Sequence, residues 1–266
     1  MKKIFLIILF AVTFGLTACS HKEKANEVRV GTIAGPETTL MNVAKKVALE
    51  KFGLHVKIIT FTDYNTPNQA LENGEIDANA FQHYPFLLSQ IKARDYNLAP
   101  VGDTFLYPMG LYSTGVKKLS DLSPGDKIAI PNDPTNEARA LLLLQKAGLI
   151  TLKPNVTINA TTQDIASNPK NFKFIALDAA QLPRSLQDVS LAAINTNYAI
   201  PAGLSPSKAL FEEQTDSPYM NLIVARTADK NTPKIKELVE AYQSAAVLQK
   251  AKELFGDAAI AGFSAH

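Results

Sequence analysis

The chain has few of the residues that most often build disulfides and metal sites. It holds one cysteine and four histidines among 266 residues, so no disulfide can form within the chain. The histidines, at positions 21, 55, 83 and 266, lack the spacing of a helical metal site, and neither CxxC nor HExxH occurs. No metal site is therefore expected, although one gathered from distant parts of the chain is left open.

Patterns of the common catalytic sites are missing as well. There is no GxSxG motif, and 31-GTIAG-35 matches neither a phosphate-binding nor a dinucleotide-binding loop. The formal net charge is only +2, whereas nucleic-acid-binding proteins are usually basic. The sequence thus predicts neither an enzyme nor a partner of nucleic acid, and an enzyme with an unrecognised set of residues is the remaining alternative.

The N-terminus carries the longest apolar run and is typical of an export signal. After a short basic start, the 13 residues 4–16 are apolar but too few for a comfortable membrane span. The following 16-LTAC-19 resembles the lipobox of bacterial lipoproteins, which implies cleavage before Cys19 and covalent lipid, palmitate included, on that residue. We expect a signal peptide at 1–18 and a lipidated tether at 19–27; an ordinary signal peptide with an incidental cysteine is the alternative.

The chain that follows alternates between strand and helix patterns. The segments 28-VRVGTI-33 and 55-HVKIITF-61 are rich in β-branched residues and predict strands. Between them, Pro36 suits the first turn of a helix, apolar residues recur at helical spacing, and Gly53 suits the helix end. The C-terminal segment 233–256 has the pattern of one long amphipathic helix. Strand, helix and strand in this order predict a parallel βαβ unit.

A similar series of patterns returns in the middle of the chain. Segment 127-KIAI-130 predicts a strand, 131-PNDPTNEARALLLLQKAGL-149 a turn followed by a helix, and 156-VTI-158 a short closing strand. Two such units predict two similar α/β lobes, and ligands of open α/β sheets bind at the carboxyl ends of the strands. We expect the chain to pass between the lobes at 104–113 and again at 191–199.

Several polar residues lie where the predicted strands end or helices begin. Arg139 lies early in the second helix, and its guanidinium suits two-pronged recognition of a carboxylate, although an exposed helical arginine is the simpler interpretation. Asn195 and Asn221 flank apolar strands and can accept hydrogen bonds from an ammonium group, but such asparagines are more often plain turn residues. Tyr64 follows the strand at 55–61. Each of these residues has both a structural and a ligand-binding interpretation.

Aromatic residues are concentrated in the segment 79-NAFQHYPFL-87. Phe81, His83 and Tyr84 lie in the connection after a strand, where they predict the wall of a pocket. Aromatic rings also suit a polarisable thioether, whereas Phe86 falls in the following helix and is interpreted as plain core. From the residues alone, the chain is an extracytoplasmic lipoprotein of two α/β lobes that binds a small ligand.

Long segments, in order along the chain, resemble the NlpA/MetQ lipoproteins. These are the methionine-binding components of bacterial ABC importers. The resemblance covers essentially the whole chain, from the lipobox to the C-terminal helix. It rests on these segments: 79-NAFQHYPFL-87, 131-PNDPTNEARALLLLQKAGLI-150, 181-QLPRSL-186, 194-INTNYA-199, 217-SPYMNLIVAR-226 and 241-AYQS-244. Two departures, Ala138 in place of a common glycine and Asn197 in place of a common threonine, leave loop detail open.

The resemblance implies a periplasmic-binding-protein fold of type II, an α/β fold in which two lobes joined by two crossovers close over an amino acid. We expect a discontinuous lobe I at 28–108 and 199–266, with lobe II at 109–198. Carried over residue by residue, the resemblance implies that Arg139 holds the ligand carboxylate and that Asn195 and Asn221 hold chiefly the ammonium. The implied side-chain pocket is formed by Tyr64, Phe81, His83, Tyr84 and, as a further candidate, Tyr198.

The implied function is capture of methionine, with L-methionine expected, and its delivery to the permease and ATPase subunits of an ABC importer. The protein itself would hydrolyse nothing, would use no cofactor or metal, and would be held at a membrane of the cell envelope by lipid on Cys19, facing the periplasm or the exterior. D-methionine, a methionine dipeptide or another small amino acid are the alternative ligands. A surface lipoprotein with an adhesion role is the alternative from another class.

Overall fold

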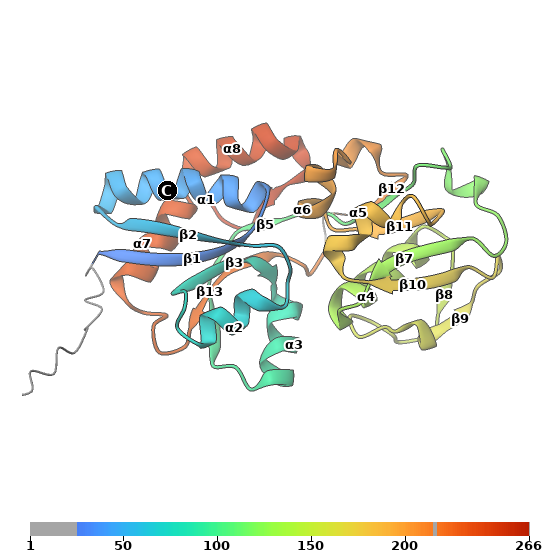
Figure 1. The fold of residues 1–266 in the computed structure, drawn as a ribbon, viewed down its shortest axis with the longest axis horizontal. Coiled ribbons are helices and arrows are strands. Elements are labelled where there is room, and N and C mark those ends of the chain that lie inside the picture. Colours follow the sequence, from blue (N-terminus) through green and yellow to red (C-terminus); the bar gives the residue numbers. More distant parts are fainter. Residues whose placement is uncertain (1–25, 215–216, 266) are drawn as a thin grey trace, which may run out of the picture.

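The computed structural model describes residues 26–214 and 217–265, apart from the side chain of Asp257. The predicted signal peptide at 1–18, the lipidation site Cys19 and most of the predicted tether lie outside the described residues. Within them, no helix is both long and apolar enough to cross a membrane. The described chain forms two lobes, each built on a five-stranded mixed sheet with helices on both faces (Figure 1), which confirms the expected α/β class.

The first sheet has the strand order β2-β1-β3-β13-β4. Strand β1 pairs in parallel with β2 and β3, whereas β13 is antiparallel to both β3 and β4. The predicted βαβ unit is therefore present at the N-terminus, and a strand from late in the chain completes the sheet. The strands are β1 (Glu27–Ile33), β2 (His55–Phe61), β3 (Ala78–His83), β4 (Leu98–Asp103) and β13 (Asn221–Arg226).

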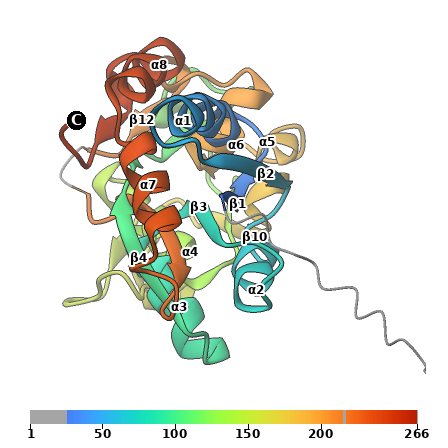
Figure 2. The same cartoon turned by 90° about the vertical axis from the view of Figure 1, so that its left-hand side faces the viewer.

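Helices cover both faces of this first sheet. Figure 2 shows α1, α7 and α8 on one side and α2 and α3 on the other. Pro36 lies in the first turn of α1, and Gly53, in the left-handed conformation at φ 63°, ends it as expected. The helices are α1 (Pro36–Phe52), α2 (Thr66–Glu72), α3 (Tyr84–Arg94), α7 (Pro233–Tyr242) and α8 (Ala245–Phe255).

The prediction of one continuous C-terminal helix is wrong. The backbone of Ser244 is extended and occupies the N-cap position of α8, so the pattern at 233–256 is divided into α7 and α8. Serine favours this position because its side chain competes for the backbone in a helix interior.

The second sheet repeats the plan of the first, with the order β10-β7-β11-β6-β12. Strand β7 pairs in parallel with β10 and β11, and β6 is antiparallel to β11 and β12. The order and the position of the antiparallel strand match those of the first sheet, so the two lobes are similar, as predicted. The strands are β6 (Gly110–Tyr112), β7 (Lys127–Pro131), β10 (Lys173–Leu177), β11 (Leu191–Ile194) and β12 (Phe211–Glu212).

The strand predicted at 156–158 is wrong. The partner that closes the second βαβ unit is β10, and the chain before it forms a short hairpin of β8 (Thr151–Leu152) and β9 (Ile165–Ser167). Asn155 adopts a left-handed turn conformation and Ile158 is exposed. The apolar residues after the turn are thus not paired in a sheet.

The helices of the second lobe also lie on opposite faces of its sheet. Alternate residues of the interior strand β7 separate the two cores, because Ile128 and Ile130 pack with α4 and Ala129 packs with α5 and α6. These helices are α4 (Pro134–Lys146), α5 (Leu182–Ser185) and α6 (Thr196–Ala199). Short 3-10 helices lie at Leu119–Asp121, Thr162–Asp164, Ala179–Gln181, Ile200–Ala202, Pro206–Lys208 and Gly256–Ala258.

The chain crosses between the sheets in two places. The first lies between β5 (Phe105–Leu106), which pairs with β14 (Ile260–Ala261), and β6, inside the segment predicted for it. The second, expected at 191–199, follows β12 instead, because β12 still pairs with β6. The lobe boundaries at 108/109 and 198/199 stay predictions. Strand β12 comes after position 199 in the chain but belongs to the second sheet.

Helix α1 provides a matched test of core packing. Leu40 is fully buried in the core of the first lobe, whereas Leu49 on the same helix is 48% exposed. We expect Leu40→Ala to lower the free energy of unfolding by about 2–5 kcal/mol, because it removes buried methyl groups and leaves a cavity. Leu49→Ala should change it far less. Urea unfolding followed by circular dichroism measures both, and equal losses would contradict the packing described.

Candidate functional site

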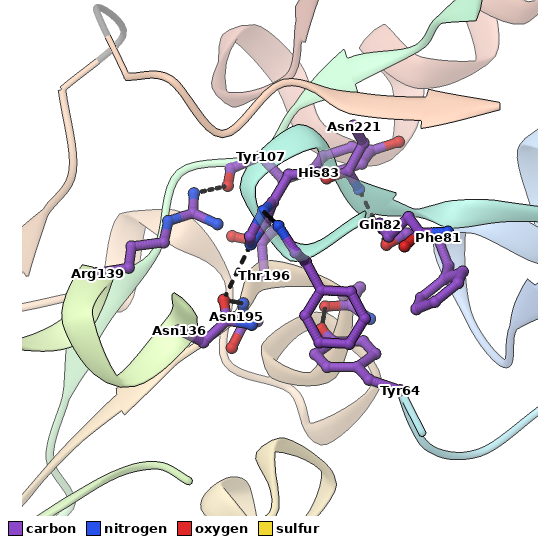
Figure 3. Close-up of a pocket in the computed structure, with 12 residues that line it drawn as sticks. Tyr64, Phe81, Gln82, His83, Tyr107, Asn136, Arg139, Asn195, Thr196 and Asn221 are labelled. Carbon is purple, nitrogen blue, oxygen red and sulfur yellow. Dashed lines mark hydrogen bonds between the residues drawn. The ribbon is translucent and has the colours of Figure 1, made fainter. Parts of the chain in front are cut away.

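A cavity lies between the two lobes and is lined by twelve of the described residues. Concave sites that combine aromatic walls with a few polar groups are typical of small-molecule binding. The first lobe contributes mainly aromatic residues and three polar ones: Tyr64, Phe81, Gln82, His83, Phe86, Tyr107 and Asn221. The second lobe contributes only polar residues: Asn136, Arg139, Asn195, Thr196 and Asn197. The cavity thus has an aromatic side and a polar side (Figure 3).

The structure brings most of the predicted site residues to this cavity. Those that line it are Tyr64, Phe81, His83, Arg139, Asn195 and Asn221. Tyr84 does not, because as the first residue of α3 it is turned away and 47% exposed. Tyr198 packs behind Tyr64 with ring centroids 5.1 Å apart, and its hydroxyl donates to the Thr62 carbonyl at 3.1 Å. The ligand-binding role of all eight residues stays a prediction.

The aromatic side is a cluster of rings from separate elements. The ring of Tyr64 lies 5.9 Å from that of Phe81 and 6.1 Å from that of Phe86, and the two phenylalanine rings are 6.0 Å apart. Phe86, expected as plain core, is both buried and part of the cavity wall, because the first turn of α3 ends at the cavity. The sequence-based interpretation of this residue was incomplete.

His83 joins the two sides of the cavity. Its Nδ1 accepts a hydrogen bond from the Phe86 backbone N–H at 3.1 Å and thereby caps α3. The proton of the neutral ring therefore lies on Nε2, which is 3.4 Å from Asn136 Oδ1 in the other lobe. Burial, followed by the positive charge of Arg139, lowers the pKa of His83 to about 3. The residue is thus a neutral hydrogen-bonding group at physiological pH.

Two asparagines leave buried polar atoms without a partner among the described residues. Asn195 Nδ2 donates to Asn136 Oδ1 at 2.9 Å, which leaves Asn195 Oδ1 unpaired. Asn197 Oδ1 accepts from the Tyr64 hydroxyl at 2.7 Å, which leaves Asn197 Nδ2 unpaired. Because unpaired buried groups are costly, one free acceptor and one free donor at the cavity indicate a polar ligand.

Arg139 supplies the positive charge of the cavity and is only 4% exposed, so its interpretation as an exposed helical arginine is wrong. Its Nε donates to both carboxylate oxygens of Glu213 at 3.1 Å, and its Nη2 donates to the Tyr107 carbonyl at 2.9 Å. Nη2 also contacts Glu213 Oε2, and the guanidinium lies 4.4 Å from the centroid of the Tyr219 ring. Arg139 is thus held by groups from both crossovers.

A buried amide network supports the wall that carries Phe81 and His83. Gln82 Nε2 donates to Asn79 Oδ1 at 2.9 Å and to Asn68 Oδ1, and Asn68 Nδ2 donates back to Gln82 Oε1 at 2.8 Å. Asn68 and Asn79 are fully buried. Because these amides satisfy one another, they fix β3 where it reaches the cavity.

Sequence reasoning missed several lining or supporting residues: Gln82, Tyr107, Asn136, Thr196 and Glu213. Asn136 lies in the segment that was interpreted as a turn and helix start. It comes three residues after Asp133, the N-cap of α4, and this spacing along the chain could have indicated its place in the first turn of the helix. Glu213 carried no such signal, because only the packing of the second crossover brings it to Arg139.

The residues that line the cavity are suited to binding a small ligand. Within the described chain, no group of three or more His, Cys, Asp or Glu side chains could hold a metal ion. The cavity instead offers one guanidinium, free amide groups and aromatic rings. Two α/β lobes that enclose such a cavity at their crossovers define a solute-binding protein of the periplasmic-binding-protein type.

The family model described as "NlpA lipoprotein" matches residues 28–263, and the chain belongs to that family. A "D-methionine-binding lipoprotein MetQ" of Salmonella typhi is 50% identical over 255 residues, which are 94% of each chain. A solved periplasmic substrate-binding protein of an ABC transporter from Coxiella burnetii is 63% identical, with a TM-score of 0.85, covering 88% of this chain and 100% of its own.

A nutrient-binding protein from Burkholderia cenocepacia, solved with bound methionine, is 52% identical at a TM-score of 0.87, covering 89% of this chain and 100% of its own. These relatives confirm the expected family and the two-lobed fold. They are substrate-binding lipoproteins rather than enzymes, and so is this chain.

Glu37 is a buried carboxyl group of the first lobe. It lies in the first turn of α1 with 3% exposure, and its Oε2 has no partner among the described residues. Burial raises its pKa from 4.5 to about 8. Its charge would raise the pKa of the surrounding tyrosines Tyr64, Tyr107, Tyr198 and Tyr242.

We expect Glu37 to make stability depend on pH. Between pH 4.5 and about 8 the folded state keeps a proton that the unfolded state releases, so its contribution to stability falls by about 1.4 kcal/mol for each unit of rising pH. Glu37→Gln should remove this slope, whereas Glu50→Gln, at an exposed position of the same helix, should not. Urea unfolding at pH 5 and pH 8 measures the difference, and an unchanged slope in Glu37→Gln would refute the assignment.

Proposed function

We propose that this protein captures methionine outside the cytoplasm and delivers it to an ABC importer. The observation that carries the proposal is a cavity between the lobes with a guanidinium and unpaired amide atoms on one side and aromatic rings on the other. The Salmonella typhi relative is named for D-methionine, the Burkholderia cenocepacia relative holds methionine, and the Coxiella burnetii relative is described as part of an ABC transporter. These descriptions support the proposal.

The two ends of the proposed ligand match the two sides of the cavity. A carboxylate would accept hydrogen bonds from Arg139, a charge-assisted contact. An ammonium would donate to the unpaired Asn195 Oδ1 and to the amide oxygen of Asn221. A thioether chain would pack against the rings of Tyr64 and Phe81, which suit a polarisable sulfur. A hydrogen bond from the ligand would thus satisfy Asn195 Oδ1, which is otherwise buried and unpaired among the described residues.

The enantiomer is the finer part of the proposal. We propose L-methionine, with D-methionine as the alternative named for the Salmonella typhi relative. The two forms exchange the positions of the hydrogen and one substituent at Cα, so only one can place all three groups on Arg139, Asn195 and the rings without distortion. A methionine dipeptide or another small amino acid would fill the same cavity differently.

Anchoring and transport partners are further parts of the proposal. Lipid on Cys19 would hold the protein at a membrane of the cell envelope, and the permease with its ATPase subunits would supply translocation and hydrolysis. An adhesion role would not require a cavity between the lobes with unpaired polar atoms, so the cavity favours transport.

Ligand identity is tested on protein that has been stripped by unfolding and refolding. We expect calorimetric titration to show binding of methionine, L more tightly than D, and mass spectrometry of the material released on unfolding to show methionine. Leucine and glutamate serve as controls for shape and for charge. If neither enantiomer binds to correctly refolded protein, the proposed function is wrong.

Arg139 is tested by removing its side chain. We expect Arg139→Ala to weaken methionine binding by about 2–5 kcal/mol, because the ligand carboxylate would lose its charged partner inside a closed cavity. Arg184→Ala, a change of the same size at an exposed position in α5, should leave the affinity unchanged. Calorimetry on both variants, with thermal melts to verify folding, separates the two expectations, and equal affinities would rule out this role.

A further inference from the structure

Arg139 is not a free cation, because Glu213 pairs with it inside the protein. The side chains are 4% and 9% exposed, and Arg139 Nε lies 3.1 Å from each carboxylate oxygen of Glu213. Glu213 directly follows β12, at the start of the second crossover, whereas Arg139 lies in α4. A buried pair of this kind is costly to break from one side only, since the remaining charge stays in a poorly solvated place.

Glu213 is itself fixed by donors from both crossovers. Its Oε2 accepts from the Met109 backbone N–H at 3.2 Å, and its Oε1 accepts from the Ser217 hydroxyl at 2.9 Å. Met109 belongs to the first crossover and Ser217 to the second. These donors and the guanidinium hold the carboxylate in one orientation.

The pairing leaves one edge of the guanidinium for a ligand. Nε and Nη2 donate to Glu213 and to the Tyr107 carbonyl, and the flat face lies on the Tyr219 ring. Nη1 donates no hydrogen bond to any described residue. Figure 3 shows it directed toward the side of the cavity where His83 and Thr196 lie. A ligand carboxylate therefore meets a single nitrogen that is held in place by the rest of the assembly.

The pairing also sets the charge of the cavity. Arg139 contributes one positive charge and Glu213 cancels it, while His83 is neutral. A zwitterion brings a carboxylate and an ammonium together and adds no net charge to this site. A monoanion of the same shape adds a charge that nothing balances, which is unfavourable where the effective dielectric constant is low.

We infer that Glu213 is a positioning and specificity-determining residue of this site. It orients Arg139 so that Nη1 alone receives the ligand carboxylate, and it cancels the arginine charge so that zwitterionic amino acids are selected over monoanions of the same shape. This inference rests on the proposed function, because it takes methionine as the zwitterion.

The test compares methionine with its α-hydroxy analogue, in which a hydroxyl replaces the ammonium and the molecule becomes a monoanion. Stripped wild type, Glu213→Gln and Glu212→Gln are titrated with both ligands by calorimetry. Glu212 is the matched control, because the change removes a carboxylate from the neighbouring residue, the last of β12, which has no bond to Arg139. We expect wild type to prefer methionine strongly, Glu213→Gln to reduce that preference by at least about tenfold, and Glu212→Gln to keep it.

A second variant, Glu213→Asp, separates the positioning of Arg139 from the cancelling of its charge. It can be measured even if Glu213→Gln does not fold. Glu213→Asp keeps the charge but shortens the reach, so both ligands should bind at least about tenfold more weakly with the preference unchanged. Equal preference in wild type and Glu213→Gln, or equal affinity for both ligands in wild type, would overturn selection by charge. Unchanged affinity in Glu213→Asp would overturn positioning. Failure of wild type to bind methionine at all would instead refute the proposed function.

Discussion

The site depends on one constraint: a guanidinium has to remain charged in a closed space between two lobes. Removing an arginine from water is costly unless its donors and its charge are matched. Glu213, the Tyr107 carbonyl and the Tyr219 ring provide that match from three separate segments. Because those segments are the first crossover and the two ends of the second one, the geometry of Arg139 is coupled to the way in which the lobes are joined.

The fold explains why these groups meet. Each sheet includes an antiparallel strand that comes after the βαβ unit of the other lobe along the chain. This strand is β13 in the first sheet and β6 in the second. The chain must therefore cross twice at the same place, and the carboxyl ends of β3, β7 and β11 face that place. His83 ends β3, and Asn136 and Asn195 come after β7 and β11 in the chain. The hydrogen bond between His83 and Asn136 joins the two sides of the cavity, whereas the one from Asn195 to Asn136 lies within its polar side.

Local patterns were enough to predict much of this arrangement. The alternation of 28–33, the proline and glycine that bound α1, and the family motifs around Arg139 and Asn195 all agreed with the structure. The failures concern long-range packing. Tyr84 points away from the cavity because of its position in the first turn of α3. The strand that pairs with β7 is β10 and not the segment 156–158. Glu213 has no local sequence feature that indicates its partner Arg139, 74 residues away. Contacts between segments so distant in the chain are set by the tertiary fold and not by periodicity.

The central claim is that a zwitterionic ligand binds to an arginine whose charge and orientation are already set by Glu213. A crystal structure of the stripped protein with added methionine tests it most directly. The account predicts the ligand carboxylate at hydrogen-bonding distance from Arg139 Nη1, the ammonium at Asn195 Oδ1, the thioether among the rings of Tyr64 and Phe81, and Glu213 still paired with Nε. A ligand carboxylate that displaces Glu213 from Arg139, or a ligand bound outside this cavity, would contradict it.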